Sequence, residues 1–76
     1  STVSEGSTEV KALLPGNVWK VVAEVGQSVN AGDVILVLES MKMEIDVVAP
    51  VGGVVKSINV SQQDKVVEGQ VVAVLG

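Results

Sequence analysis

The sequence predicts an all-β domain: a flattened eight-stranded barrel, or sandwich, of two four-stranded antiparallel sheets related by approximate two-fold symmetry. Three observations support this fold class. Short valine-rich runs alternate with turn residues, no segment has the 3.6-residue period of a helix, and the second half repeats the first. A chain of 76 residues makes one small domain, whose strands must pair with one another so that few sheet edges are left unpaired.

Turn residues between the valine-rich runs predict where each strand begins and ends. Residues 1–8 are rich in Ser, Thr, Gly and Glu, so we expect a flexible tail or linker there and the folded domain over residues 9–76. We expect strands at Val10–Leu14, Val18–Glu24, Ser28–Val29, Val34–Ser40, Met43–Val48, Gly53–Val60, Lys65–Val67 and Val71–Leu75.

Two of these strands predict where the core lies. In the second strand, alternation favours the odd-numbered residues from Trp19 to Val25 as the face toward the core. The fourth strand, residues 34–40, has apolar residues at both odd and even positions over most of its length. Such a strand is expected at the centre of a sheet, or covered on both of its faces.

The internal repeat is read from matched residues whose separation grows along the chain. Pro15 matches Pro50 at a separation of 35, Lys20 matches Lys56 at 36, and the run 32–38 matches the run 69–75 at 37. The growing separation predicts two inserted residues in the second half. One is expected near Gly52 and Gly53, and the other, held as a β-bulge, between Lys56 and Gln63.

The strands at 34–40 and 43–48 leave two residues, Met41 and Lys42, at the tip of a tight hairpin. Two-residue hairpin turns favour Asn-Gly or other glycine-containing corners, because their backbone needs φ > 0. Met and Lys in such a turn cost about 1 kcal/mol each in backbone strain. We therefore expect φ > 0 at Met41 or Lys42, and a lysine amine that is displayed for a reason.

Composition argues against several classes of function. Without Cys or His the chain has no thiolate nucleophile and no common zinc ligand, and its nine acidic residues show no metal-ligand spacing. A net charge of −4 argues against nucleic-acid binding. No apolar run approaches the roughly 20 residues of a membrane helix, and no signal peptide is visible. We expect a soluble, cytoplasmic module that is not itself an enzyme.

The hairpin residues also resemble a known signature. The Ser-Met-Lys-Met run at 40–43 is similar to the Ala-Met-Lys-Met motif of biotinyl domains, the biotin carboxyl carrier modules of biotin-dependent carboxylases and decarboxylases. The resemblance covers residues 9–76, and the Gly-Asn-x-Trp-Lys run at 16–20 looks like that of small biotin/lipoyl attachment proteins. It implies a lipoyl/biotinyl-type barrel, and the short span from Val22 to Val29 leaves no room for a protruding thumb loop.

This resemblance implies a role for each hairpin residue. Biotin would be attached covalently to Lys42, with Met41 and Met43 recognised by the ligase and the carboxylase. Lipoyl domains usually have an acidic residue before the lysine and a small one after it, so two methionines favour biotin. The remaining motif flanks are Ser40, which stands where alanine is commonest, and the acidic residues Glu39 and Glu44.

The resemblance further implies a monomeric carrier that serves several enzymes. A biotin protein ligase would modify the lysine, a biotin carboxylase would load a carboxyl group, and a carboxyltransferase or decarboxylase would receive it. Two alternatives remain open. One is a lipoyl carrier for acyl or one-carbon transfer, and the other is an unmodified barrel-type hairpin domain that acts as an interaction module.

Overall fold

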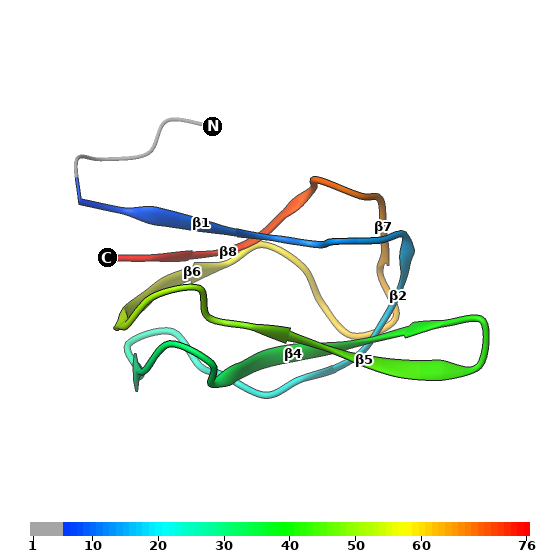
Figure 1. Ribbon diagram of the computed structural model, residues 1–76, viewed down its shortest axis with the longest axis horizontal. Coiled ribbons are helices and arrows are strands. Elements are labelled where there is room, and N and C mark those ends of the chain that lie inside the picture. The colour runs from blue at the N-terminus through cyan, green and yellow to red at the C-terminus, as the bar shows by residue number, and fades with distance from the viewer. Residues whose placement is uncertain (1–5) are drawn as a thin grey trace.

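The computed structural model describes residues 6–76, and every regular element in that range is a β-strand (Figure 1). None of the described residues forms a helix long and apolar enough to cross a membrane. In chain order the strands are β1 (Thr8–Lys11), β2 (Gly16–Val21), β3 (Ser28–Val29), β4 (Val34–Ser40), β5 (Met43–Val48), β6 (Gly53–Ile58), β7 (Lys65–Val66) and β8 (Val71–Leu75).

The strands form two four-stranded antiparallel sheets, ordered β1-β8-β6-β3 and β5-β4-β2-β7. The core cluster draws on strands of both sheets, and its largest fully buried side chains include Ile35, Leu36, Leu38 and Leu75. β4 lies between β5 and β2, as its apolar residues at both odd and even positions predict. The predicted all-β fold of two four-stranded sheets is confirmed.

The predicted strand bounds are right for β3, β4, β5 and β8 and wrong at several other ends. The chain bends between β1 and Pro15, so β1 stops at Lys11, earlier than predicted. β2 stops at Val21, because the N–H groups of Val22 and Ala23 both donate to the Ile35 carbonyl and the ladder ends. β1 begins at Thr8, the last residue of the expected tail, and residues 1–5 of that tail lie outside the described residues.

The backbone registers show that the two halves repeat at a constant separation of 37 residues. β2 pairs with β4 through Val18 and Leu38, and β6 pairs with β8 through Val55 and Leu75, each 37 positions later. The pairing of β1 with β8 repeats in the same way as the pairing of β5 with β4. The internal two-fold symmetry is therefore carried by the hydrogen bonds of the whole fold.

Both predicted insertions in the second half are wrong, because the separation is 37 throughout and both halves contain the same β-bulge. The register slips at Trp19 in β2 and at Lys56 in β6. Trp19 is thus equivalent to Lys56, and Lys20 is equivalent to Ser57. The match of Lys20 with Lys56 in the sequence is misleading, since exposed residues beside a bulge can change type without disturbing the ladder.

The bulge in β2 also overturns part of its predicted inward face. Val18 is buried, whereas Trp19 is 45% exposed and Val25 is 64% exposed. A bulge places two residues opposite one on the partner strand, so simple alternation fails across it. Beyond the bulge, Val21 packs against the core and Ala23 is buried, as alternation predicts.

The turn that follows β2 is built like the turn that follows β6. Gln27 Oε1 accepts a hydrogen bond from the Glu24 N–H at 3.0 Å, and Asp64 Oδ2 accepts one from the Ser61 N–H at 2.8 Å. The residue before each acceptor is left-handed: Gly26 has φ 92° and Gln63 has φ 74°. Glycine adopts this conformation freely, whereas glutamine is strained in it.

We predict that Gln63→Gly raises the free energy of unfolding by about 0.5 kcal/mol, because relief of left-handed strain outweighs the added freedom of the unfolded chain. The matched change in the other half, Gly26→Ala, should lower it by about 1 kcal/mol. Urea unfolding measures both values. A loss of stability in Gln63→Gly would show that position 63 is not strained.

Candidate functional site

The hairpin between β4 and β5 is paired to its last residue. Glu39 pairs with Glu44, and Ser40 pairs with Met43, which leaves two residues for the turn. Met41 has φ 52° and Lys42 has φ 64°. Left-handed angles at both central residues are those of a type I′ turn, whose twist matches the strands that it joins. The predicted positive φ is confirmed at both positions.

The internal repeat isolates this turn from the rest of the fold. Its pairing maps residues 8–39 onto residues 45–76. Residues 40–42 have no counterpart among the residues that the structure describes, whereas Met43 and Glu44 correspond to Gly6 and Ser7 at the same separation. The repeat therefore does not explain the Ser-Met-Lys sequence of this turn, which needs a reason other than the symmetry of the barrel.

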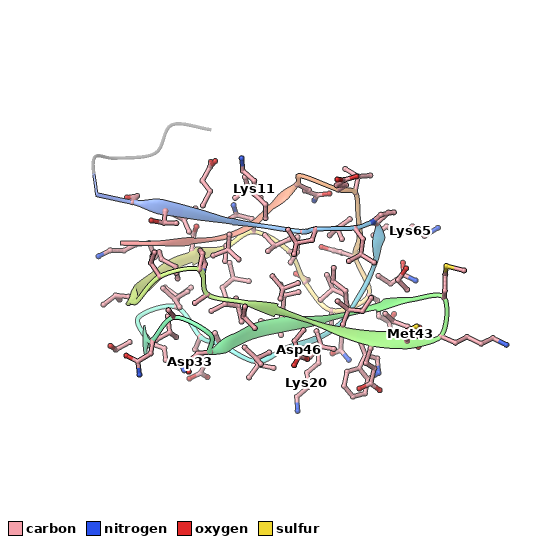
Figure 2. All side chains as sticks on the ribbon, in the orientation of Figure 1. Lys11, Lys20, Asp33, Met43, Asp46 and Lys65 are labelled. Atoms are coloured by element: carbon pink, nitrogen blue, oxygen red, sulfur yellow. The ribbon has the colours of Figure 1, made fainter. Side chains whose placement is uncertain are left out.

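The hairpin end projects from the barrel. It lies at the opposite end of the long axis from the C-terminus and the beginning of β1 (Figure 1). Met43 lies near this end (Figure 2) and is 63% exposed, and Met41 is 91% exposed. Lys42, between them, is exposed as well. Two large apolar side chains thus stand in solvent on either side of an amine.

Lys42 makes no hydrogen bond or ion pair with any residue from 6 to 76, in contrast to Lys11, whose Nζ lies 3.9 Å from Glu9 Oε1. A lysine amine becomes a nucleophile when it loses its proton, and no described group is placed to remove that proton. The described residues also contain no cluster of three or more potential metal ligands. The site can therefore present a nucleophile, and a partner must supply the base.

Carboxylates line the strand positions behind the lysine. Glu39 and Glu44 lie directly opposite each other, and both are exposed. Asp46 follows Glu44 by two residues and so lies on the same face of β5. Like charges opposite each other destabilise a sheet. The acidic face therefore does not serve the stability of the hairpin.

Gly16 fixes the base of the hairpin, a role that the sequence analysis did not assign. A Cβ at this position would lie 2.7 Å from the Glu39 carbonyl oxygen and 3.4 Å from Ser40 Cβ. β2 can approach the end of β4 this closely because residue 16 has no side chain. A glycine inside a predicted strand, which often marks a close backbone approach, is the signal that could have revealed it.

Comparisons with known proteins agree with this geometry. A family model described as "Biotin-requiring enzyme", that of the biotin/lipoyl family, matches residues 3–75. The chain is 42% identical over 67 residues to a biotinylated protein of Mycobacterium leprae, a TB7.3 homolog, and covers 94% of it with 88% of its own length. It is also 42% identical over 62 residues to the biotin/lipoyl attachment protein of Bacillus subtilis, with coverage of 82% of this chain and 85% of that protein.

Solved structures give the same result. The whole chain superposes on 7% of the urea carboxylase of Kluyveromyces lactis, with a TM-score of 0.94 and 34% identity. A more distant match is the lipoyl domain of the 2-oxoglutarate dehydrogenase complex from Azotobacter vinelandii, with a TM-score of 0.68 and 26% identity. That match covers 82% of this chain and 78% of the lipoyl domain.

We predict that Gly16→Ala lowers the free energy of unfolding by about 2 kcal/mol, because its Cβ would force the backbones of β2 and β4 apart. Gly53→Ala is the matched control in the other half. Its Cβ would lie 3.2 Å from the Gly76 oxygen, a looser contact than the 2.7 Å at Gly16, so we expect a loss of about 0.5 kcal/mol. Equal losses in thermal or urea unfolding would contradict this account of Gly16.

We predict that the double substitution Met41→Asn with Lys42→Gly raises the free energy of unfolding by about 1–2 kcal/mol. Asn-Gly is the preferred pair for a type I′ turn, so the left-handed strain at both positions would be relieved. Urea unfolding measures the gain, and Met41→Ala with Lys42→Ala serves as a control that keeps the strain. If the two double variants were equally stable, the turn would not be strained.

Proposed function

The chain belongs to the biotin/lipoyl attachment family, and from that membership we propose that it carries biotin on Lys42 and shuttles a carboxyl group between enzymes. It is a non-catalytic carrier related to the subunits of carboxylases and decarboxylases. The observation that supports Lys42 as the attachment point is its place at the exposed, strained turn between β4 and β5.

The proposed attachment step forms one amide bond. Lys42 Nζ, after losing its proton to a base on a biotin protein ligase, attacks the activated carboxyl carbon of biotin. The new C–N bond forms as the activating group leaves with the electron pair of its own bond, and the nitrogen loses a second proton to give the neutral amide. The exposed amine, with no partner among the described side chains, suits attack within the active site of another protein.

The barrel supplies a rigid base for the attached group. Biotin, when attached, provides a ureido nitrogen that accepts a carboxyl group and gives it up again. The chain's own part is to hold the arm at one end of the molecule and to raise its effective concentration at each enzyme. We propose a biotin carboxylase and a carboxyltransferase or decarboxylase as these partners.

We assign recognition to the two methionines. Met41 and Met43 are too exposed to add much to the core, and each offers a flexible thioether that adapts to different surfaces. Ser40 is half-buried beneath them, while Glu39 and Glu44 give the same end of the barrel a negative charge. Such a site suits partners that combine an apolar pocket with basic residues.

Lipoylation is the second candidate. The Bacillus subtilis relative is named for both cofactors, and the lipoyl domain from Azotobacter vinelandii shares the fold. The methionines on both sides of the lysine favour biotin. The masses of the two groups differ, so the intact mass of a modified chain identifies which of them is attached.

We predict that a biotin protein ligase adds one biotinyl group to the chain, and that Lys42→Arg abolishes the mass increase. Arginine keeps the charge but cannot form the amide. Lys20→Arg and Lys65→Arg serve as controls and should be labelled like the unaltered chain. A Lys42→Arg variant that still gained the biotinyl mass would refute the assignment of the attachment site.

A further inference from the structure

A shallow hollow lies beside the base of the hairpin, at the end of β4 and along β2. Its lining residues are Asn17, Val18, Trp19, Glu39, Gln62, Gln63 and Lys65. We propose that this hollow is a docking site for the headgroup of the biotin carried on Lys42 while the arm is outside an enzyme. This inference rests on the proposed function, because it needs a biotin on that lysine.

The internal repeat supplies a comparison within the same molecule. Every described position of the hollow has an equivalent in the other half, 37 residues away, where the same backbone is built. The positions equivalent to Asn17, Trp19, Gln62, Gln63 and Lys65 hold Val54, Lys56, Val25, Gly26 and Ser28. The same backbone therefore forms without an aromatic ring or three side-chain amides. These groups are found only at the equivalent position that lies nearer Lys42.

Gln63 makes this contrast sharpest. Its N–H donates to the Val18 carbonyl at 2.6 Å, and the Gly26 N–H donates to the equivalent carbonyl of Val55 at 2.8 Å. Both residues are left-handed, but glycine is the unstrained choice. The glutamine side chain is therefore kept at a position where the fold favours having none. Strain of this kind is typical of functional sites.

The amides of the hollow are free to bind a ligand. Among the described residues, the side chains of Asn17, Gln62 and Gln63 make no hydrogen bond, whereas the turn residues Gln27 and Asp64 use theirs. Each primary amide offers two N–H donors and one carbonyl acceptor. The ureido ring of biotin presents a carbonyl between two N–H groups, which complements such a set.

Trp19 provides the apolar part of the site. Its side chain is about half exposed, on the outward side of the bulge, and it is the chain's single aromatic residue. An indole face packs well against a compact ring that contains a thioether sulfur. The hollow thus combines one flat apolar wall with polar groups around it, as a small-molecule site does.

The attached arm is long enough to reach the hollow. Lys42 lies three residues beyond Glu39 in the chain, a span of at most about 11 Å. The lysine side chain and the five-carbon acyl chain of biotin together exceed that span when extended. Tethering raises the local concentration of the headgroup to roughly the millimolar range, so a weak, open site is enough to hold it. Free biotin at micromolar concentration would leave the hollow empty.

The test compares biotinylated and unmodified protein by two-dimensional ¹⁵N–¹H NMR, after intact mass has shown one biotin on Lys42. We expect shifts in the indole N–H of Trp19 and in the side-chain amides of Asn17, Gln62 and Gln63. The side-chain amides of Gln27 and Asn30, which do not line the hollow, should not shift. The changes should be independent of protein concentration, and free biotin should not reproduce them at the same concentration.

A second experiment uses variants in which residues of the hollow are replaced by their equivalents in the internal repeat. Trp19→Lys with Asn17→Val should remove the biotin-dependent shifts of Gln62 and Gln63. If the docked form makes up about two thirds of the molecules, streptavidin should also bind the variant about threefold faster. Lys56→Trp is the matched control and should leave both readouts unchanged.

Two results separate this inference from the function on which it rests. Biotin found on Lys42 with shifts confined to residues 40–44 would overturn the docking site and leave the carrier function intact. An unmodified Lys42 after treatment with a biotin protein ligase would overturn the proposed function, and the docking site with it.

Discussion

The structure depends on the pairing of β4 with β5, which is continuous from Leu36 to Ser40. Because the ladder continues to Ser40 and Met43, two residues must reverse the chain, and both must adopt left-handed angles. An Asn-Gly pair would make this turn with the least strain, but it would display no amine. Met41 and Lys42 accept the strain and place a primary amine between two thioethers, at a point that the barrel cannot bury. One backbone constraint thus fixes the position, exposure and neighbours of the lysine.

The repeated barrel holds this turn in place. β4 is paired on both sides, by β5 and β2, and its buried side chains lie in the core that the two sheets share. The close approach of Gly16 to Glu39 extends this support to the base of the hairpin. The equivalent edge of the other half ends at Gly76, on the far side of the molecule. The symmetry of the fold therefore separates the displayed lysine from the chain end.

Much of the fold and the hairpin could be predicted, because they depend on local signals. Runs of apolar residues between turn residues gave correct bounds for β3, β4, β5 and β8, and a two-residue gap predicted the left-handed turn. The bulge at Trp19 was missed, and with it the buried Val18, because a bulge is set by which backbone groups pair across strands. The residue types of Val18, Trp19 and Lys20 carry no mark of it. The close approach of Gly16 depends on the spacing of two strands, which sequence alone does not give.

We propose that the strained turn exists to present Lys42 for covalent attachment of biotin. Tandem mass spectrometry of the peptide that contains residues 39–44, taken from the protein as it is isolated from its native cells, tests this claim most directly. We expect one biotinyl group on Lys42 and none on the other four lysines. An unmodified Lys42, or a biotin on any other lysine, would contradict it.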